Sequence, residues 1–236
     1  MSFDSFINES RLDESINDIG IFKAVFLAGQ PGAGKTYVAS KIKSGVIEPR
    51  IVNVDTITEF LNIHDTDSVY PKAKQLSKNQ LVQYLNGVLP LFIDMTGANV
   101  SRMKDRIYSL EQIGYDTALV FVNTSLETAI FRAQKRIRKV SPEVITEYYN
   151  KIKNLKNEIK SLFSFNIEIN NDEGELTDAV LMKAYKRIYY FYDSEIDNPI
   201  GQERQSTMIK NGWKYLEPNI MSISEIKRLA NVWYAP

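Results

Sequence analysis

Residues 29–36 read Gly-Gln-Pro-Gly-Ala-Gly-Lys-Thr and directly follow a short apolar run, Lys23–Ala28. An apolar run that ends in glycine is typical of a buried parallel strand, and a helix is predicted from about Lys35 to Lys43. The spacing Gly-x-x-x-x-Gly-Lys-Thr between a strand and a helix is that of a phosphate-binding loop (P-loop), whose glycines let consecutive backbone N–H groups surround phosphate oxygens. The alternative is a coincidental glycine-rich loop. The strand-to-helix context favours a nucleotide site.

The loop supplies the residues that are expected to bind this nucleotide. Lys35 would neutralise the β and γ phosphates, and Thr36 would ligate magnesium. The helix that starts near Lys35 would add the positive end of its dipole. We therefore expect ATP or GTP with Mg²⁺ as cofactors, bound by Gly29, Gln30, Pro31, Gly32, Ala33, Gly34, Lys35 and Thr36.

Strands and helices alternate on the C-terminal side of the loop. This alternation predicts a parallel sheet covered by helices on both faces, so the expected fold is an α/β three-layer sandwich with about five strands and a mainly helical C-terminal extension. The expected strands after the first are 50–55, 89–94, 117–122 and 165–170, and the expected helices are 56–61, 77–88, 100–114, 143–163 and 176–191. The segment 125–139 is expected to begin with a helix and to end in a basic stretch.

Three segments organise the chain. Residues 1–20 read as an N-terminal leader or short helix, residues 21–174 as the nucleotide-binding core, and residues 175–236 as an extension packed on that core. The ordinary globular composition, 44% hydrophobic and 25% charged, fits one large domain with an appendage.

The composition excludes several classes of function. Lys plus Arg and Asp plus Glu both number 29, so no global charge draws the chain to nucleic acid or to an anionic membrane. The absence of cysteine removes disulfides and thiolate chemistry, and the cytosol is the natural compartment. No apolar stretch approaches the roughly 18 residues that a spanning helix needs, so no membrane partner is expected.

Two predicted strands end in an acid, Asp55 and Asp94. The carboxyl ends of parallel strands meet at the ligand crevice, so Asp55 is placed to orient an acceptor hydroxyl and take its proton. Its alternative role is to cap the following helix. Asp94, with Thr96 in the polar turn beside it, is a candidate either for magnesium or for the acceptor hydroxyl, and the alternative is a turn that only caps a helix.

A basic cluster lies between two predicted helices, at Arg132, Lys135, Arg136, Arg138 and Lys139. Arg132 and Arg136 are four residues apart, so on a helix they share a face and can bind the same triphosphate. Such guanidinium groups stabilise the phosphoryl group in the transition state. The alternative is a solvated face, but the P-loop favours a lid.

Together these motifs resemble the zeta toxin and polynucleotide kinase group of P-loop kinases. The resemblance covers about 24–170, and its landmarks are the P-loop, Val-Asp55-Thr-Ile, Phe-Ile-Asp94-Met-Thr96-Gly97 and Phe-Arg132-Ala-Gln-Lys-Arg136. It implies that Lys35 and Thr36 bind phosphates and magnesium, that Asp55 is the catalytic base, that Asp94 and Thr96 contact the acceptor, and that Arg132 and Arg136 stabilise the phosphoryl group. Asp55 lacks the basic residue that usually follows closely in the family, which leaves the acceptor open.

The resemblance implies transfer of the ATP γ-phosphoryl group to a hydroxyl of a nucleotide, nucleotide sugar or nucleic-acid end. A P-loop ATPase or nucleotide-binding module without a phosphorylated acceptor is the second hypothesis, and an inert protein bound by an antitoxin or packed in a virion is the third. The opening Phe3-x-x-Phe6-Ile7-x-Glu9 resembles tags that direct proteins into phage capsids, which implies a phage origin, action in the host cytoplasm and packaging in the virion.

Overall fold

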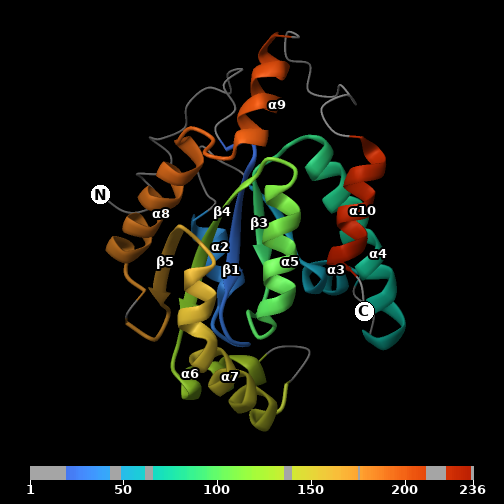
Figure 1. Ribbon diagram of the computed structural model, residues 1–236. Coiled ribbons are helices and arrows are strands. Elements are labelled where there is room, and N and C mark those ends of the chain that lie inside the picture. The colour runs from blue at the N-terminus through green and yellow to red at the C-terminus, as the bar shows by residue number, and fades with distance from the viewer. Residues whose placement is uncertain are drawn as a thin grey trace.

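The computed structural model describes residues 20–42, 49–61, 66–135, 140–174, 176–210 and 222–234. Its centre is a sheet of five parallel strands in the order β2-β3-β1-β4-β5, drawn in Figure 1. The strands are β1 (Lys23–Ala28), β2 (Arg50–Val52), β3 (Leu91–Asp94), β4 (Asp116–Asn123) and β5 (Phe165–Asn170). The predicted α/β architecture with about five parallel strands is confirmed.

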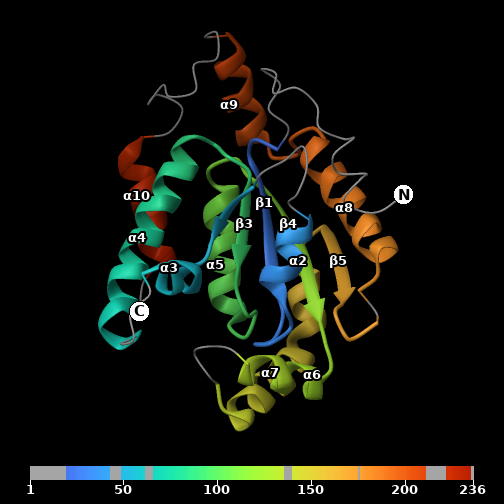
Figure 2. The ribbon, with the colours of Figure 1, turned by 180° about the vertical axis from the view of Figure 1, so that it is seen from behind.

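Helices cover both faces of this sheet. One face carries α4 (Thr66–Asn86), α5 (Val100–Glu111), α7 (Pro142–Ser161) and α10 (Ile223–Trp233), as seen in Figure 1. The other face carries α2 (Lys35–Ile42) and α8 (Asp178–Asp193), which lie toward the viewer in Figure 2. The remaining helices are α3 (Val54–Phe60), α6 (Leu126–Gln134) and α9 (Pro199–Lys210).

The strands supply both cores by alternation. In β1, Phe26 contributes to the core beneath α5 and α7, whereas its neighbours Val25 and Leu27 contribute to the core beneath α2 and α8. All six residues of β1 are buried, as expected for a central strand with helices on both sides. The strand that leads into the P-loop is therefore enclosed along its whole length, and the first residue of the loop has a fixed position.

Two elements differ from the sequence prediction. The strand predicted at 50–55 ends at Val52, because Asn53 Oδ1 accepts the backbone N–H of Asp55 at 2.7 Å and the chain turns into α3. The helix predicted at 77–88 begins at Thr66 and includes Pro71. Its first turns carry few apolar residues, so the hydrophobic pattern gave no signal there.

A buried ion pair at the start of β1 joins the core to the C-terminal helices. The Lys23 Nζ donates to Asp116 Oδ2 at 2.8 Å, Ser194 Oγ at 3.1 Å and Glu195 O at 2.7 Å. Asp116 also accepts the backbone N–H groups of Asp197 and Asn198, both at 2.9 Å. All three protons of this ammonium group have acceptors, so the connection from α8 to α9 is fixed to the first residues of β1 and β4.

No helix in the described ranges is long and apolar enough to cross a membrane. The Phe3-x-x-Phe6-Ile7-x-Glu9 motif lies outside the described residues.

Candidate phosphate-binding and acceptor site

The P-loop lies at the carboxyl end of the sheet, between the loops that follow β3 and β4. The Gly29 N–H donates to Thr96 O at 3.2 Å, which ties the start of the loop to the turn after β3. On the other side the Gln30 side chain is buried and donates to Thr124 O at 2.7 Å. The loop is therefore held from both neighbouring strands, and its backbone amides are fixed before any ligand binds.

Packing requires glycine at Gly29, where the loop begins, and at two positions further along it, Gly32 and Gly34. Gly32 has a φ of 84°, and a Cβ there would lie 2.3 Å from the Ala129 carbonyl oxygen of α6. Gly34 has a φ of 81°, and its Cβ would lie 2.3 Å from Asn171 Nδ2. Both backbones adopt the left-handed conformation that only glycine enters without strain. The glycines of the loop thus reflect close contacts as well as room for phosphate.

Lys35 is the first residue of α2, and its amine lies across the mouth of the loop. Its Nζ donates to the Gly29 carbonyl oxygen at 3.1 Å and lies 3.9 Å from Asp94 Oδ1. Both side chains are nearly buried, with exposed fractions of 12% and 11%. The structure therefore brings together the predicted charge clamp and the predicted acid of β3 in one largely desolvated pair.

Asn53 connects this acid to Asp55. Its Nδ2 donates to Asp94 Oδ2 at 2.8 Å while its Oδ1 accepts the Asp55 N–H at 2.7 Å. The capping position of α3 is thus taken by Asn53, and the alternative in which Asp55 caps that helix is wrong. Asp55 lies in the first turn of α3 and is exposed.

The turn after β3 carries the other predicted acceptor residue, Thr96. It is partly buried, and its Oγ1 accepts the Ala98 N–H at 3.3 Å. Asn99 caps α5 by accepting the Arg102 N–H at 2.9 Å, so capping in this turn falls to Asn99 rather than to Asp94. Asp94 and Thr96 therefore remain candidates for substrate contacts.

Arg132 reaches the P-loop from the last turn of α6. Its Nη1 donates to the Asn171 carbonyl oxygen at 2.7 Å and lies 3.7 Å from the place that a Cβ on Gly34 would take. The buried Asn171 in turn donates from Nδ2 to Ala33 O at 2.7 Å. One residue after β5 thus holds both the loop and the arginine. Arg136, the second predicted arginine, lies outside the described residues.

Asp172 fixes the start of α6. It accepts Thr124 Oγ1 at 2.6 Å, Ser125 N at 2.9 Å and Ser125 Oγ at 2.9 Å. Partial burial acts to raise the pKa of this carboxyl, but the hydrogen bonds from Thr124 and Ser125 outweigh it and lower the pKa to about 2. The carboxylate is therefore ionised at neutral pH, and it anchors the helix that carries Arg132.

The oxygen atoms at this end of the sheet suit a hard cation that is bound together with phosphate. Within the described ranges no group of three or more His, Asp or Glu side chains gathers as a metal cage. The exposed Thr36 hydroxyl follows Lys35 directly, and oxygen ligands of this kind suit Mg²⁺ when phosphate oxygens and water supply the rest.

Asn53, Asn171 and Asp172 are the functional candidates that the sequence reasoning missed. Asn53 and Asn171 directly follow a strand, Asp172 is the second residue after β5, and Asp94 ends its own strand, so a polar residue at a strand end was the available signal. None of the three belongs to a motif with a fixed spacing.

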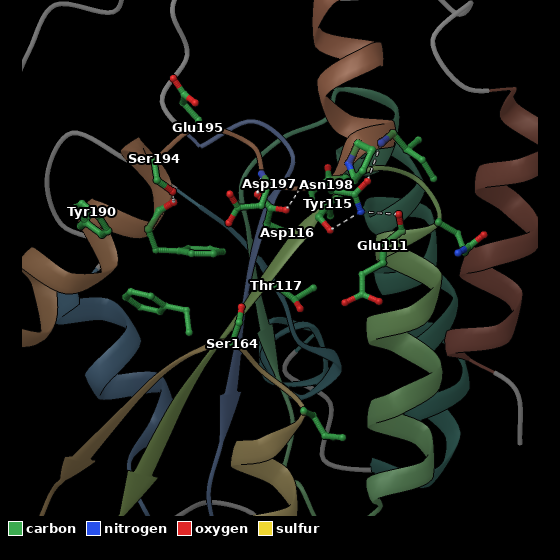
Figure 3. Close-up of a pocket in the computed structure, with 16 residues that line it drawn as sticks. Glu111, Tyr115, Asp116, Thr117, Ser164, Tyr190, Ser194, Glu195, Asp197 and Asn198 are labelled. Atoms are coloured by element: carbon green, nitrogen blue, oxygen red, sulfur yellow. Dashed lines mark hydrogen bonds between the residues drawn. The ribbon is translucent and has the colours of Figure 1, made fainter.

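A cavity of about 950 Å³ lies at the opposite, amino end of the strands and is shown in Figure 3. Glu111, Asp116, Tyr190 and Asn198 contribute to its wall, around the ion pair that binds the α8–α9 connection. Ligands of parallel α/β sheets bind at the carboxyl ends of strands, so the P-loop and not this cavity is the candidate active site.

The fold and the site define a P-loop kinase, a phosphotransferase that binds a nucleoside triphosphate. The zeta toxin family model matches residues 22–181, which is more than half of the 236 residues. The chain belongs to the zeta toxin family. No curated protein matches the sequence.

Solved structures are similar to this chain at low sequence identity. A chain of the AvrRxo1-ORF1:ORF2 complex with ATP is 13% identical with a TM-score of 0.51, and the alignment covers 99% of this chain and 86% of that one. A chain of the Pnkp1/Rnl/Hen1 RNA repair complex is 16% identical with a TM-score of 0.50, covering 61% of this chain and 49% of that one. A chain of the PezAT toxin-antitoxin system of Streptococcus pneumoniae is 16% identical with a TM-score of 0.45, covering 81% and 94%.

Proposed function

We propose that the protein transfers the γ-phosphoryl group of ATP, with Mg²⁺, to a hydroxyl of a nucleotide, nucleotide sugar or nucleic-acid end. The observation that carries this proposal is the chain of contacts from the P-loop to Asp55. Lys35 Nζ lies 3.9 Å from Asp94 Oδ1, and Asn53 joins the other oxygen of Asp94 to the Asp55 backbone at 2.8 and 2.7 Å. These contacts link Lys35, the lysine assigned to phosphate, to Asp55, whose carboxylate is suited to an alcohol acceptor.

In this reaction Asp55 holds the acceptor hydroxyl and takes its proton as the oxygen attacks phosphorus. The new P–O bond forms while the bond between the γ-phosphorus and the bridging oxygen breaks, and ADP leaves with the electron pair. Lys35 and Arg132 offset the negative charge of the phosphoryl oxygens, and Arg136 is assigned the same role. Bound Mg²⁺ would neutralise further charge between phosphate oxygens, and Thr36 is the loop residue that would hold it.

Asp94 and Thr96 are assigned to the acceptor. Asp94 accepts Asn53 Nδ2 through one oxygen and faces Lys35 with the other. Thr96 sits in the turn whose carbonyl oxygen holds Gly29, so a substrate bound there lies next to the loop. The contact of both residues with the P-loop supports their assignment to one shared site.

Transfer is tested with γ-labelled ATP and a panel of nucleotides, nucleotide sugars and 5′-hydroxyl oligonucleotides. Lys35→Ala should abolish transfer. Asp55→Asn should keep ATP affinity and lower kcat by about 10²- to 10⁴-fold, the usual contribution of a general base. Asp178→Asn is a matched control, because Asp178 is also an exposed acid in the first turn of a helix.

Full activity in Asp55→Asn would show that the base is another group. Release of labelled phosphate without a labelled acceptor would favour the ATPase hypothesis, with Asp94 as the magnesium ligand. Absence of ATP binding would contradict the phosphotransferase itself.

We also infer a protein partner of the antitoxin type. The support is family membership together with two structural relatives, since PezAT is a toxin-antitoxin system and AvrRxo1-ORF1 is crystallised with AvrRxo1-ORF2. Co-expression with the product of an adjacent gene tests it. Expression of the chain alone should inhibit growth, and a co-expressed antitoxin should relieve that inhibition and co-purify with the wild-type chain.

A further inference from the structure

The cavity at the amino end of the strands lies where β4 extends beyond β5. β4 begins at Asp116, whereas β5 begins at Phe165, which pairs with Ala118. Asp116 and Thr117 therefore have no residue of β5 beside them, and a space opens between the end of α5, the start of β5 and the connection from α8 to α9 (Figure 3). Its volume of about 950 Å³ is within the usual range of small-molecule sites, about 300–1,000 Å³.

Thr117 places an unused hydroxyl in the wall of this cavity. Its side chain lines the cavity, lies between Glu111 and Ser164 in Figure 3, and is only 8% exposed. The hydroxyl has no hydrogen-bond partner among the described residues. Nearly every buried polar group in a folded protein is hydrogen-bonded, so this oxygen is available to a ligand in the cavity.

Three carboxylates of the wall have no counter-charge. Glu111, Glu195 and Asp197 are exposed and form no ion pair within the described ranges. Asp116, the fourth acid of the wall, is neutralised by Lys23 at 2.8 Å. Burial and, after it, the charge of Asp116 raise the pKa of Glu111, because negative charge is already concentrated there. A bound cation would relieve this repulsion.

Hydrogen bonds hold the acids of the wall in place. Asp116 accepts the backbone N–H groups of Asp197 and Asn198, both at 2.9 Å, and Asn198 Nδ2 donates to the Glu111 carbonyl oxygen at 2.9 Å. The Glu195 carbonyl oxygen accepts the buried ammonium group at the start of β1, at 2.7 Å. The backbone at all three uncompensated acids is therefore fixed before any ligand binds.

The separation of these acids does not suit a single metal ion. Among the residues that the structure describes, no three His, Asp or Glu side chains lie close enough together to hold one. Carboxylates spread around a cavity instead match a ligand whose positive charges are spaced along a chain. The rings of Tyr190 and Phe165 also line the cavity, and aromatic rings bind both methylene groups and organic cations.

We propose that this cavity is a second binding site, separate from the nucleotide site, and that its ligand is a linear polyamine. The ammonium groups of the ligand bind the carboxylates of Glu111, Glu195 and Asp197, and one of them donates to the Thr117 hydroxyl. The ligand thereby joins the end of α5 to the connection between α8 and α9. The proposal goes beyond the phosphotransferase function and does not depend on it.

Binding is measured by calorimetry with spermidine at low ionic strength, because salt screens exposed charges. Wild type should bind spermidine at one site. Glu111→Gln and Asp197→Asn should each weaken binding about fivefold, and the double variant at least about tenfold. Asp105→Asn is the matched control, since Asp105 is an exposed acid of the same helix as Glu111, has no ion pair in the described part of the chain and does not line the cavity. It should leave the Kd unchanged.

Thr117→Val tests the hydroxyl separately. The substitution keeps the shape of the side chain and removes its oxygen, so it should weaken spermidine binding about threefold. Glu111 and Asp197 are exposed, so their variants are expected to fold even if Thr117→Val does not. Spermidine should also raise the Tm of wild type, and it should raise the Tm of the double variant less at the same concentration.

Three results overturn the site. The first is equal spermidine affinity in wild type and the double variant, including no binding in either. The second is a loss in Asp105→Asn as large as that in Glu111→Gln, which would indicate general attraction to exposed acids. The third is an oligolysine peptide that binds wild type but not the double variant while spermidine binds neither, which would assign the cavity to a basic segment of a protein partner.

Discussion

Asn171 is a single residue that serves two functional groups. Its side chain donates to the P-loop at Ala33 O, and its carbonyl oxygen accepts Arg132 Nη1, both at 2.7 Å. Its Nδ2 also fills the space that a Cβ on Gly34 would need. Asn171 therefore positions the loop and the arginine without any need to touch the nucleotide.

Replacement of the Asn171 side chain should loosen the P-loop, whereas the backbone carbonyl oxygen that accepts Arg132 Nη1 is kept. Asn171→Ala leaves the buried Ala33 carbonyl oxygen without its donor, at a cost of about 1–3 kcal/mol. We expect the Kd for ATP to rise about tenfold, by calorimetry. Asn170→Ala is the control, since Asn170 is exposed and its side chain, among the described residues, accepts only Asn123 Nδ2, at 3.2 Å. Equal ATP affinity in both variants would contradict the positioning role.

The element β1 carries a functional group at each end. Its last residues lead into the P-loop, and its first residue, Lys23, is bonded to Asp116, Ser194 and Glu195. β4 has the same arrangement, with Asp116 at its start and Thr124 just past its end. The two central strands thus connect the C-terminal helices with the nucleotide site.

Lys23→Met should destabilise the whole chain, because it leaves the nearly buried Asp116 carboxylate without its counter-charge. The expected loss in the free energy of unfolding is about 3–5 kcal/mol, measured by urea denaturation. Lys104→Met removes an exposed ion pair with Glu158 and should cost no more than about 1 kcal/mol. If the two variants lose the same stability, the buried pair contributes little.

The element α6 depends on Asp172 at its start. The pKa of this carboxyl is lowered to about 2, so its hydrogen bonds add stability that is fully present above pH ~4 and is lost as the pH falls toward about 2. Because the group is partly exposed, we expect Asp172→Asn to cost on the order of 1 kcal/mol at pH 7.

The difference in unfolding free energy between wild type and Asp172→Asn should narrow as the pH is lowered through that window. Urea denaturation at several pH values measures it. A difference that stays constant down to pH ~2 would mean that the carboxylate charge does not hold α6.

At the scale of the whole molecule, the C-terminal helices complete both layers. Ile188, Phe191 and Tyr192 of α8 belong to the core of one face, and Leu229 and Trp233 of α10 to the core of the other. Each large apolar side chain contributes about 1.5–3 kcal/mol when buried. We therefore propose that residues 175–236 pack on the 21–174 core as an extension and are needed for its stability.

A chain that ends at residue 174 should not fold cooperatively, because the side chains of α8 and α10 together account for about as much free energy as a whole domain's net stability. Circular dichroism during heating measures the transition. A chain that ends at residue 221 loses only α10 and should show a smaller fall in Tm. A cooperative transition of the 174-residue chain near the wild-type Tm would contradict the proposal.

The sequence predicted the sheet and the P-loop because both leave local signals. Buried parallel strands read as continuous apolar runs, and the glycines of the loop reflect close contacts such as those of Gly32 and Gly34. The partners of those glycines lie far along the chain, Asn171 among them, and a single asparagine has no pattern. The exact end of β2 was missed for the same reason. It depends on one hydrogen bond, which the Asp55 backbone N–H donates to the Asn53 side-chain oxygen.

The position of Trp233 gives the molecule an optical reporter. The chain has two tryptophans, and Trp233 is 2% exposed against the Arg106 guanidinium, so its emission depends on whether α10 is seated. In a Trp213→Phe background the indole fluorescence would follow that one helix alone. Movements of α10 against α4 and α5 can then be followed in real time, without a label and without turnover.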